Sequence, residues 1–172
     1  DGGHTSCRHD HAFLNTGNAQ DVTGAGYLGA ATVALRTVGV TNIDVSWIGG
    51  TVAPNAVVYG IRLQLAVGDG AFQDVPDANG QPTEYLRNPV AGHQQVIAPV
   101  TLPATANGQP YVQLRWRYYF VSGTSGARAQ LSIDDIRVAK SAPVLAGSLT
   151  NLTSSVGGEW RLTRFVLEGS PH

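Results

Sequence analysis

The sequence predicts an all-β protein built as an antiparallel β-sandwich, and three observations support this prediction. Apolar and polar residues alternate along several short segments, which is the pattern of a strand with one buried face. Turn-forming residues separate these segments at short intervals. Charged residues make up only 13% of the 172 residues, while glycine occurs 21 times, a composition typical of a β-rich domain with many turns.

The alternation is clearest in the two long segments 57–67 and 111–121. The first places six apolar side chains on one face, namely Val57, Tyr59, Ile61, Leu63, Leu65 and Val67. The second does the same with Val112, Leu114, Trp116, Tyr118 and Phe120. Further strands are predicted at 31–37 (where alanines leave a helix as the alternative), 42–48, 71–75, 94–102 and 129–138. We expect Gly49-Gly50 to end the strand 42–48, and Trp47 and Trp116 to be core residues.

The length suits one domain with a full hydrophobic core, which we place at residues 1–140. Residues 141–172 consist of a linker-like stretch followed by 159–168, which is either a last strand of this domain or the start of a following module; the role of Trp160 stays open. The sequence starts at Asp1 and contains no methionine. We therefore expect a mature form or an excised module.

Charge and motifs exclude several classes of function. The net charge of -1 provides no basic field for nucleic acid or an anionic membrane, and no apolar run approaches the about 18–20 residues of a membrane span. The sequence contains no GxSxG elbow, P-loop or HExxH motif. It also gives no reason to pair any of its carboxylates as a glycosidase requires, including Asp44, Asp74, Asp77 and Glu84. We therefore expect neither an enzyme nor a nucleic-acid or membrane partner.

The segment from Tyr111 to Val138, YVQLRWRYYFVSGTSGARAQLSIDDIRV, consists of a long strand, a loop and a closing strand that ends in Ile-Asp-Asp-Ile. It resembles the end of secreted bacterial jelly-roll modules, among them carbohydrate-binding modules, and the resemblance extends over residues 12–140. The resemblance implies a jelly-roll sandwich and a secreted, extracellular location. It also implies a polysaccharide partner and attachment to other domains of a larger protein.

The same resemblance implies a structural calcium ion. In calcium-containing members the first aspartate of the closing motif is a ligand, and the other ligands come from the N-terminal segment. Carried over, Asp134 is the ligand, with Asp135 as the second choice and Asp10, Asn15 or Asn18 as partners. Calcium takes about six to eight oxygen ligands, which carboxylates and carbonyls supply. The alternative is that Asp134 or Asp135 caps a turn or pairs with an arginine.

The polar sides of the two long strands carry the candidate ligand-binding residues. They are Arg62, Gln64, Gln113, Arg115, Arg117 and Tyr119. Guanidinium and amide groups form paired hydrogen bonds with sugar hydroxyls, and arginine binds carboxylates through two parallel hydrogen bonds. Tyr119 or Tyr111 could stack on a sugar ring. Three arginines suit an acidic glycan, whereas the alternative is an ordinary solvated sheet face.

An N-terminal cluster offers a different chemistry. His4, Cys7, His9, Asp10 and His11 lie within eight residues and could ligate zinc or copper, although their spacing matches no standard motif. Cys7 is the only cysteine, so no internal disulfide is expected. His93 has no evident partner, and Tyr27 and Tyr85 fall in loop-like segments that could line a binding edge.

The leading interpretation is a non-catalytic polysaccharide-binding module of a larger secreted bacterial protein, expected to be a monomer. A structural or adhesive spacer domain without a small ligand is the second interpretation. A metal-dependent enzyme that uses the N-terminal histidines is the third.

Overall fold

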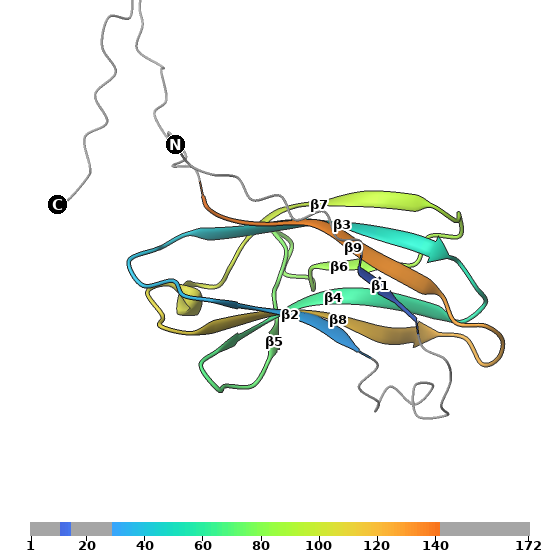
Figure 1. The fold of residues 1–172 in the computed structure, drawn as a ribbon, viewed down its shortest axis with the longest axis horizontal. Coiled ribbons are helices and arrows are strands. Elements are labelled where there is room, and N and C mark those ends of the chain that lie inside the picture. Colours follow the sequence, from blue (N-terminus) through green and yellow to red (C-terminus); the bar gives the residue numbers. More distant parts are fainter. Residues whose placement is uncertain (1–10, 15–28, 142–172) are drawn as a thin grey trace, which may run out of the picture. The chain divides into compact units, whose positions relative to one another are not determined.

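The computed structural model describes residues 11–14 and 29–141, which form two antiparallel β-sheets packed face to face (Figure 1). The described elements are β1 (His11–Phe13), β2 (Ala30–Leu35), β3 (Ile43–Ala53), β4 (Val58–Val67), β5 (Gln73–Asp74), β6 (Glu84–Leu86), β7 (His93–Thr101), the 3₁₀ turn η1 (Ala104–Ala106), β8 (Val112–Ser122) and β9 (Gln130–Lys140). The predicted all-β antiparallel sandwich is confirmed, and 31–37 contains a strand instead of a helix.

The chain passes back and forth between the two sheets. Sheet A has the order β1-β9-β3-β7, and sheet B has the order β2-β8-β4-β5, with β6 also paired to β4. Strands from the two ends of the domain are therefore neighbours in both sheets: β1 pairs with β9, and β2 pairs with β8. This interleaved order is that of a jelly roll. It also places β8 at the centre of sheet B, between β2 and β4.

The predicted apolar faces of the long strands point into the space between the sheets. In β4 and β8 the residues Tyr59, Ile61, Leu63, Val112, Leu114, Trp116 and Tyr118 are all 0% exposed. Trp47 is 1% exposed, and its ring meets that of Trp116 edge to face with 6.5 Å between centroids. The prediction that both tryptophans are core residues is confirmed.

The prediction that Gly49-Gly50 ends a strand was wrong, because β3 continues through both glycines to Ala53. A Cβ atom at Gly49 would lie 2.6 Å from Cβ of Tyr85, and one at Gly50 would collide with Oγ of Ser132. The glycines therefore make room for side chains of neighbouring strands. Glycine has this role within sheets in addition to its role in turns.

Sequence reasoning also missed two short strands. β1 pairs with β9 so that His11 lies opposite Ile133, and the ring of Phe13 stacks on that of Tyr118 at 5.8 Å. β6 pairs with β4, and its Tyr85 is 1% exposed. The interpretation of Tyr85 as a loop residue at a binding edge was therefore wrong.

Several predicted features lie outside the described residues. They are His4, Cys7, His9, Asp10, Asn15, Asn18, Tyr27, Trp160 and the segment 159–168. β9 ends at Lys140 and the described residues extend to 141, so the domain boundary at residue 140 stays a prediction. Within residues 11–14 and 29–141, no helix has the length and apolar character needed to cross a membrane.

Candidate functional site

The outer face of sheet B brings the six predicted ligand-binding residues together. In the β4–β8 register, Arg62 lies opposite Arg117, Gln64 opposite Arg115, Ala66 opposite Gln113, and Gly60 opposite Tyr119. The inward-facing residues between them are buried, so the six point away from the core. We call this surface the polar face; it also includes Asp74 of β5 and Glu84 of β6.

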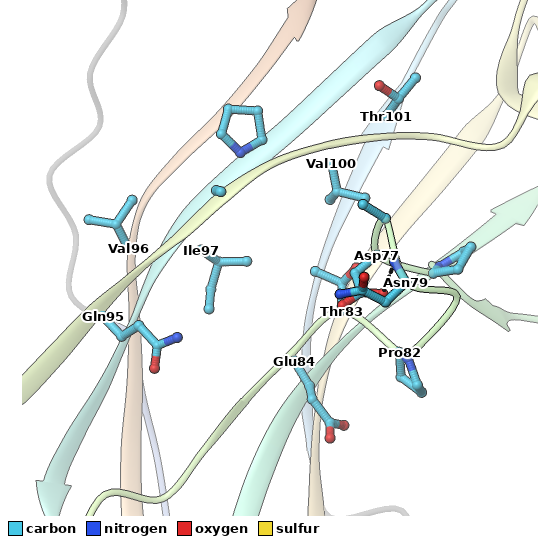
Figure 2. Close-up of a pocket in the computed structure, with 14 residues that line it drawn as sticks. Asp77, Asn79, Pro82, Thr83, Glu84, Gln95, Val96, Ile97, Val100 and Thr101 are labelled. Atoms are coloured by element: carbon cyan, nitrogen blue, oxygen red, sulfur yellow. Dashed lines mark hydrogen bonds between the residues drawn. The ribbon is translucent and has the colours of Figure 1, made fainter.

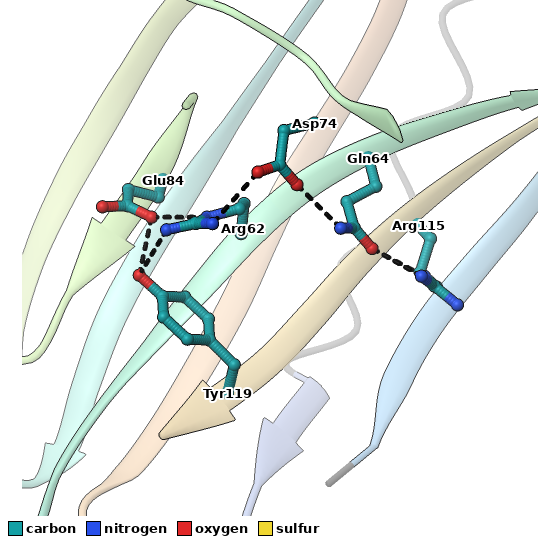
Figure 3. Close-up of polar contacts among 6 residues, drawn as sticks. All are labelled: Arg62, Gln64, Asp74, Glu84, Arg115 and Tyr119. Carbon is teal, nitrogen blue, oxygen red and sulfur yellow. Dashed lines mark hydrogen bonds and ion pairs between the residues drawn. The ribbon is translucent and has the colours of Figure 1, made fainter. Parts of the chain in front are cut away.

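Arg62 is the centre of the polar face. Its Nε donates a hydrogen bond to Oε2 of Glu84 at 2.8 Å, and its Nη1 donates to Oδ2 of Asp74 at 3.0 Å. Its Nη2 donates to the hydroxyl of Tyr119 at 3.1 Å. Figure 3 shows the guanidinium between these three partners. Two carboxylates thus neutralise Arg62, whose side chain is 28% exposed.

The contacts continue away from Arg62 in both directions. The Tyr119 hydroxyl donates to Oε2 of Glu84 at 2.6 Å, and Nε2 of Gln64 donates to Oδ1 of Asp74 at 2.7 Å. Arg115 donates from Nε and Nη2 to Oε1 of Gln64, at 3.0 and 2.6 Å. These contacts form one continuous chain in Figure 3, which we call the Arg62 network. Its members are Arg62, Gln64, Asp74, Glu84, Arg115 and Tyr119.

Two groups of the Arg62 network, Arg62 and Tyr119, have shifted pKa values. Burial alone would lower the pKa of Arg62, but the hydrogen bond to Glu84 and the charges of its neighbours outweigh burial and raise it. Burial, together with the hydrogen bond to Glu84, raises the pKa of Tyr119 to about 12. Arg62 is therefore a cation and Tyr119 a neutral donor at neutral pH.

Two aromatic rings brace the arginines. A Cβ atom at Gly60 would lie 2.9 Å from Cε1 of Tyr119, so the absence of a side chain at Gly60 lets this ring lie against β4. The Arg62 guanidinium lies 4.5 Å from the centroid of the same ring. The Arg115 guanidinium lies 3.7 Å from the ring centroid of Phe72, a residue that sequence reasoning did not select.

Arg117 differs from the other two arginines. Its cross-strand neighbours are Arg62 on β4 and Ala30 on β2. In the part of the chain that the structure describes, it makes no hydrogen bond or ion pair, and its Nε is shielded from solvent without an acceptor. Two like charges directly opposite each other destabilise a sheet.

Gln113, the last of the six predicted residues, is not part of the Arg62 network. Its Nε2 donates a hydrogen bond to the carbonyl of Gly68 at 3.1 Å.

A second candidate site is a cleft of about 610 Å³ between β7 and the segment 76–84 (Figure 2). All of residues 95–101 line it, so the cleft follows the edge of β7, because alternate side chains face opposite sides of a strand. Asp77 on its rim accepts hydrogen bonds from the backbone N–H groups of Asn79 and Gln81, which lower its pKa. The lining residues include neither an aromatic ring nor a cation, so the cleft suits a sugar less well than the polar face does.

His93 has a partner that the sequence did not reveal. Its Nδ1 lies 3.0 Å from the hydroxyl of Tyr85, which is also 2.8 Å from Oγ1 of Thr51. Oγ1 of Thr51 accepts a further hydrogen bond from the backbone N–H of Asn88. This group ties β6 of sheet B to β3 and β7 of sheet A.

The predicted calcium ligands lie at an irregularity in β9. Asp134 is opposite Ile48, and the register with β3 then shifts at Asp135, which adopts a φ of 46°. Oδ1 of Asp134 accepts the backbone N–H of Asp135 at 2.8 Å. Asp134 thus contacts the backbone at the bulge through its own side chain.

The described residues do not by themselves fit a calcium ion. Within them, no three His, Cys, Asp or Glu side chains gather closely enough to hold a metal, and Asp134 and Asp135 fall well short of about six to eight oxygens. Asp10 and Asn15, the predicted partners, lie outside the described residues, so the calcium site stays a prediction.

By its fold, this protein is an all-β antiparallel sandwich. The outer face of one of its sheets carries polar side chains that are joined by hydrogen bonds and ion pairs. Comparison of the chain with protein-family models, with curated proteins and with solved structures finds no match.

Proposed function

We propose that this domain is a non-catalytic polysaccharide-binding module and that the polar face is its binding surface. The observation that carries the proposal is the Arg62 network, which holds the guanidinium groups of Arg62 and Arg115 in fixed positions on the outer face of sheet B. Its one amide, that of Gln64, is only 6% exposed and serves to hold Arg115 in place. Groups that are already ordered lose less conformational entropy when a ligand binds. Planar donors of this kind suit the closely spaced hydroxyls of a sugar chain.

A binding role suits these residues better than catalysis does. The carboxylates of the polar face, Asp74 and Glu84, are both bound to Arg62. A glycosidase needs one carboxyl group to donate a proton to the substrate and a second to act on the sugar or on water. Carboxylates committed to an arginine are poorly suited to either task.

The wider setting of the module is part of the same proposal. Secretion by a bacterium, attachment to further domains and a structural calcium ion rest on the resemblance of the closing segment Tyr111 to Val138, and we propose a monomeric state alongside them. The proposed role is to keep a larger protein in contact with its polysaccharide.

A structural or adhesive spacer domain is the second candidate, and one observation favours it. The donors and acceptors of Arg62, Gln64 and Tyr119 are satisfied by one another, as they would be on a surface that has no ligand. The metal-dependent enzyme depends on the N-terminal cluster of His4, Cys7, His9, Asp10 and His11, of which only the backbone of His11 lies within the described residues, so this interpretation stays a prediction.

Affinity electrophoresis in native gels that contain neutral or acidic polysaccharides tests the proposal. We expect at least one polysaccharide to retard the protein, and the double variant R115A/R117A to migrate as in a gel without polysaccharide. The matched control is R137A/K140A, which removes two exposed cations from sheet A. Circular dichroism confirms that both variants fold.

Failure of every polysaccharide to retard the wild type would refute the binding function and leave the spacer. Unchanged retardation of R115A/R117A would instead show that the ligand binds at another surface.

A further inference from the structure

We propose that Arg117 binds the carboxylate of a uronic acid unit, so that the ligand of the polar face is an acidic polysaccharide. This inference rests on the proposed function and deepens it by naming the class of polysaccharide. It is carried by the charge arrangement around Arg117.

The strand order separates Arg117 from the acidic residues of the polar face. Asp74 and Glu84 come from β5 and β6, which pair with the edge of β4 farther from β8. Both carboxylates bind Arg62. No carboxylate of the described residues pairs with Arg117, so within this part of the chain its guanidinium has no acidic partner.

The surroundings of Arg117 favour an anion. Arg62 lies directly opposite it in the register, and a bound carboxylate would offset the repulsion between the two cations. Its other cross-strand neighbour, Ala30, has a side chain too short to cover the guanidinium. The guanidinium presents N–H donors in a planar fork that matches the two oxygens of a carboxylate.

The size of the charge excess favours a carboxylate polymer over a sulfated one. Three arginines and two carboxylates leave the polar face with one positive charge in excess, on a chain whose net charge is -1. A net excess of one positive charge matches a polymer with one carboxylate per sugar better than it matches a more densely charged chain. A densely sulfated chain would require several such charges.

The test compares polygalacturonate with its methyl ester, which has the same sugar backbone without the charge, and adds dextran sulfate and a neutral glucan. Binding of the wild type and of R117Q is measured by affinity electrophoresis, with R137Q as the matched control. We expect polygalacturonate to retain the wild type and R137Q equally. The affinity of R117Q for polygalacturonate should be lower by a factor of about ten or more, because one charged, two-point contact is lost.

Esterification of the polymer should reduce wild-type binding to the same extent as R117Q. Because no described residue pairs with Arg117 and the substitution removes its repulsion with Arg62, R117Q should melt at or slightly above the wild-type temperature. Lost binding would then not reflect unfolding. Equal retention of wild type by the ester or the neutral glucan, retention by dextran sulfate alone, or unchanged binding of R117Q would overturn this inference and leave the proposed function in place. No retention by any of the four polymers would overturn both.

Discussion

Replacement of Arg62 by methionine is the most informative perturbation of the polar face, because it removes the centre of the Arg62 network. Methionine keeps an unbranched apolar side chain of similar length. The variant loses the bonds to Glu84, Asp74 and Tyr119 at 2.8, 3.0 and 3.1 Å. It also leaves two neighbouring carboxylates without their cation.

The expected loss of unfolding free energy in Arg62→Met follows from how deeply the charged side chains are buried. An exposed ion pair contributes about 0–1 kcal/mol, whereas breaking a buried pair costs about 3–5 kcal/mol. The side chains of Arg62, Asp74 and Glu84 are 28%, 36% and 22% exposed, which places this group between the two limits. Relief of the repulsion between Arg62 and Arg117 offsets part of the loss. We expect the free energy of unfolding to fall by about 2 kcal/mol.

Urea denaturation followed by tryptophan fluorescence measures this change, because Trp47 and Trp116 are buried and report loss of the core. Arg137→Met is the matched control on an exposed position of β9 and should lie within about 0.5 kcal/mol of the wild type. If Arg62→Met also stays within about 0.5 kcal/mol, the Arg62 network does not stabilise the domain and the reasoning fails.

Three further predictions concern other parts of the molecule. Gly49→Ala should lower the free energy of unfolding by about 2–3 kcal/mol, because its Cβ would overlap the ring of Tyr85; a loss below about 1 kcal/mol in urea denaturation would show that the ring moves aside. The pKa of Tyr119 is raised to about 12 in the folded protein. The stabilisation of the folded state that comes from its neutral hydroxyl is therefore complete below a pH of about 10. It is lost between about pH 10 and 12, because the unfolded chain releases this proton first. The stability difference between wild type and Tyr119→Phe should therefore shrink over that window, and a constant difference in urea titrations at each pH would contradict it. If the predicted calcium ion is bound, a chelator should lower the melting temperature of the wild type, calcium should restore it, and Asp134→Asn should not respond; an unchanged wild-type melting temperature would remove calcium from the proposal.

The fold was predictable where strands are long. In β4 and β8, ten or more residues alternate, and burial of one face follows from that alternation alone. β1 and β6 have three residues each, too few to show a period. Gly49 was misread because glycine appears in turns and also at close contacts within sheets, and only the position of Tyr85 distinguishes the two.

The candidate site was predictable only in part. Alternation within each strand correctly placed Arg62 and Gln64 on one face of β4, and the other four residues on one face of β8. Their contact with Asp74 and Glu84 depends on which strands pair. β5 has two residues, and the segment 75–83 separates it from β6, so no local pattern connects these acids to Arg62.

Strand order also explains why the three arginines, which look alike in the sequence, differ in the fold, and it yields a direct test. β6 and β5 supply carboxylates to Arg62, and Gln64 holds Arg115, whereas the neighbour of Arg117 on β2 is Ala30. Ala30→Glu would place a carboxylate opposite Arg117 in the register.

We expect Ala30→Glu to raise the free energy of unfolding by about 0.2–1 kcal/mol through the new cross-strand pair, and to weaken binding of polygalacturonate because the carboxylate competes for the guanidinium. Ala34→Glu is the matched control, since it adds the same charge to β2 opposite Gln113. Urea denaturation and affinity electrophoresis measure the two effects. If both variants weaken binding equally, general repulsion of the polymer explains the result, and the specific role of Arg117 does not hold.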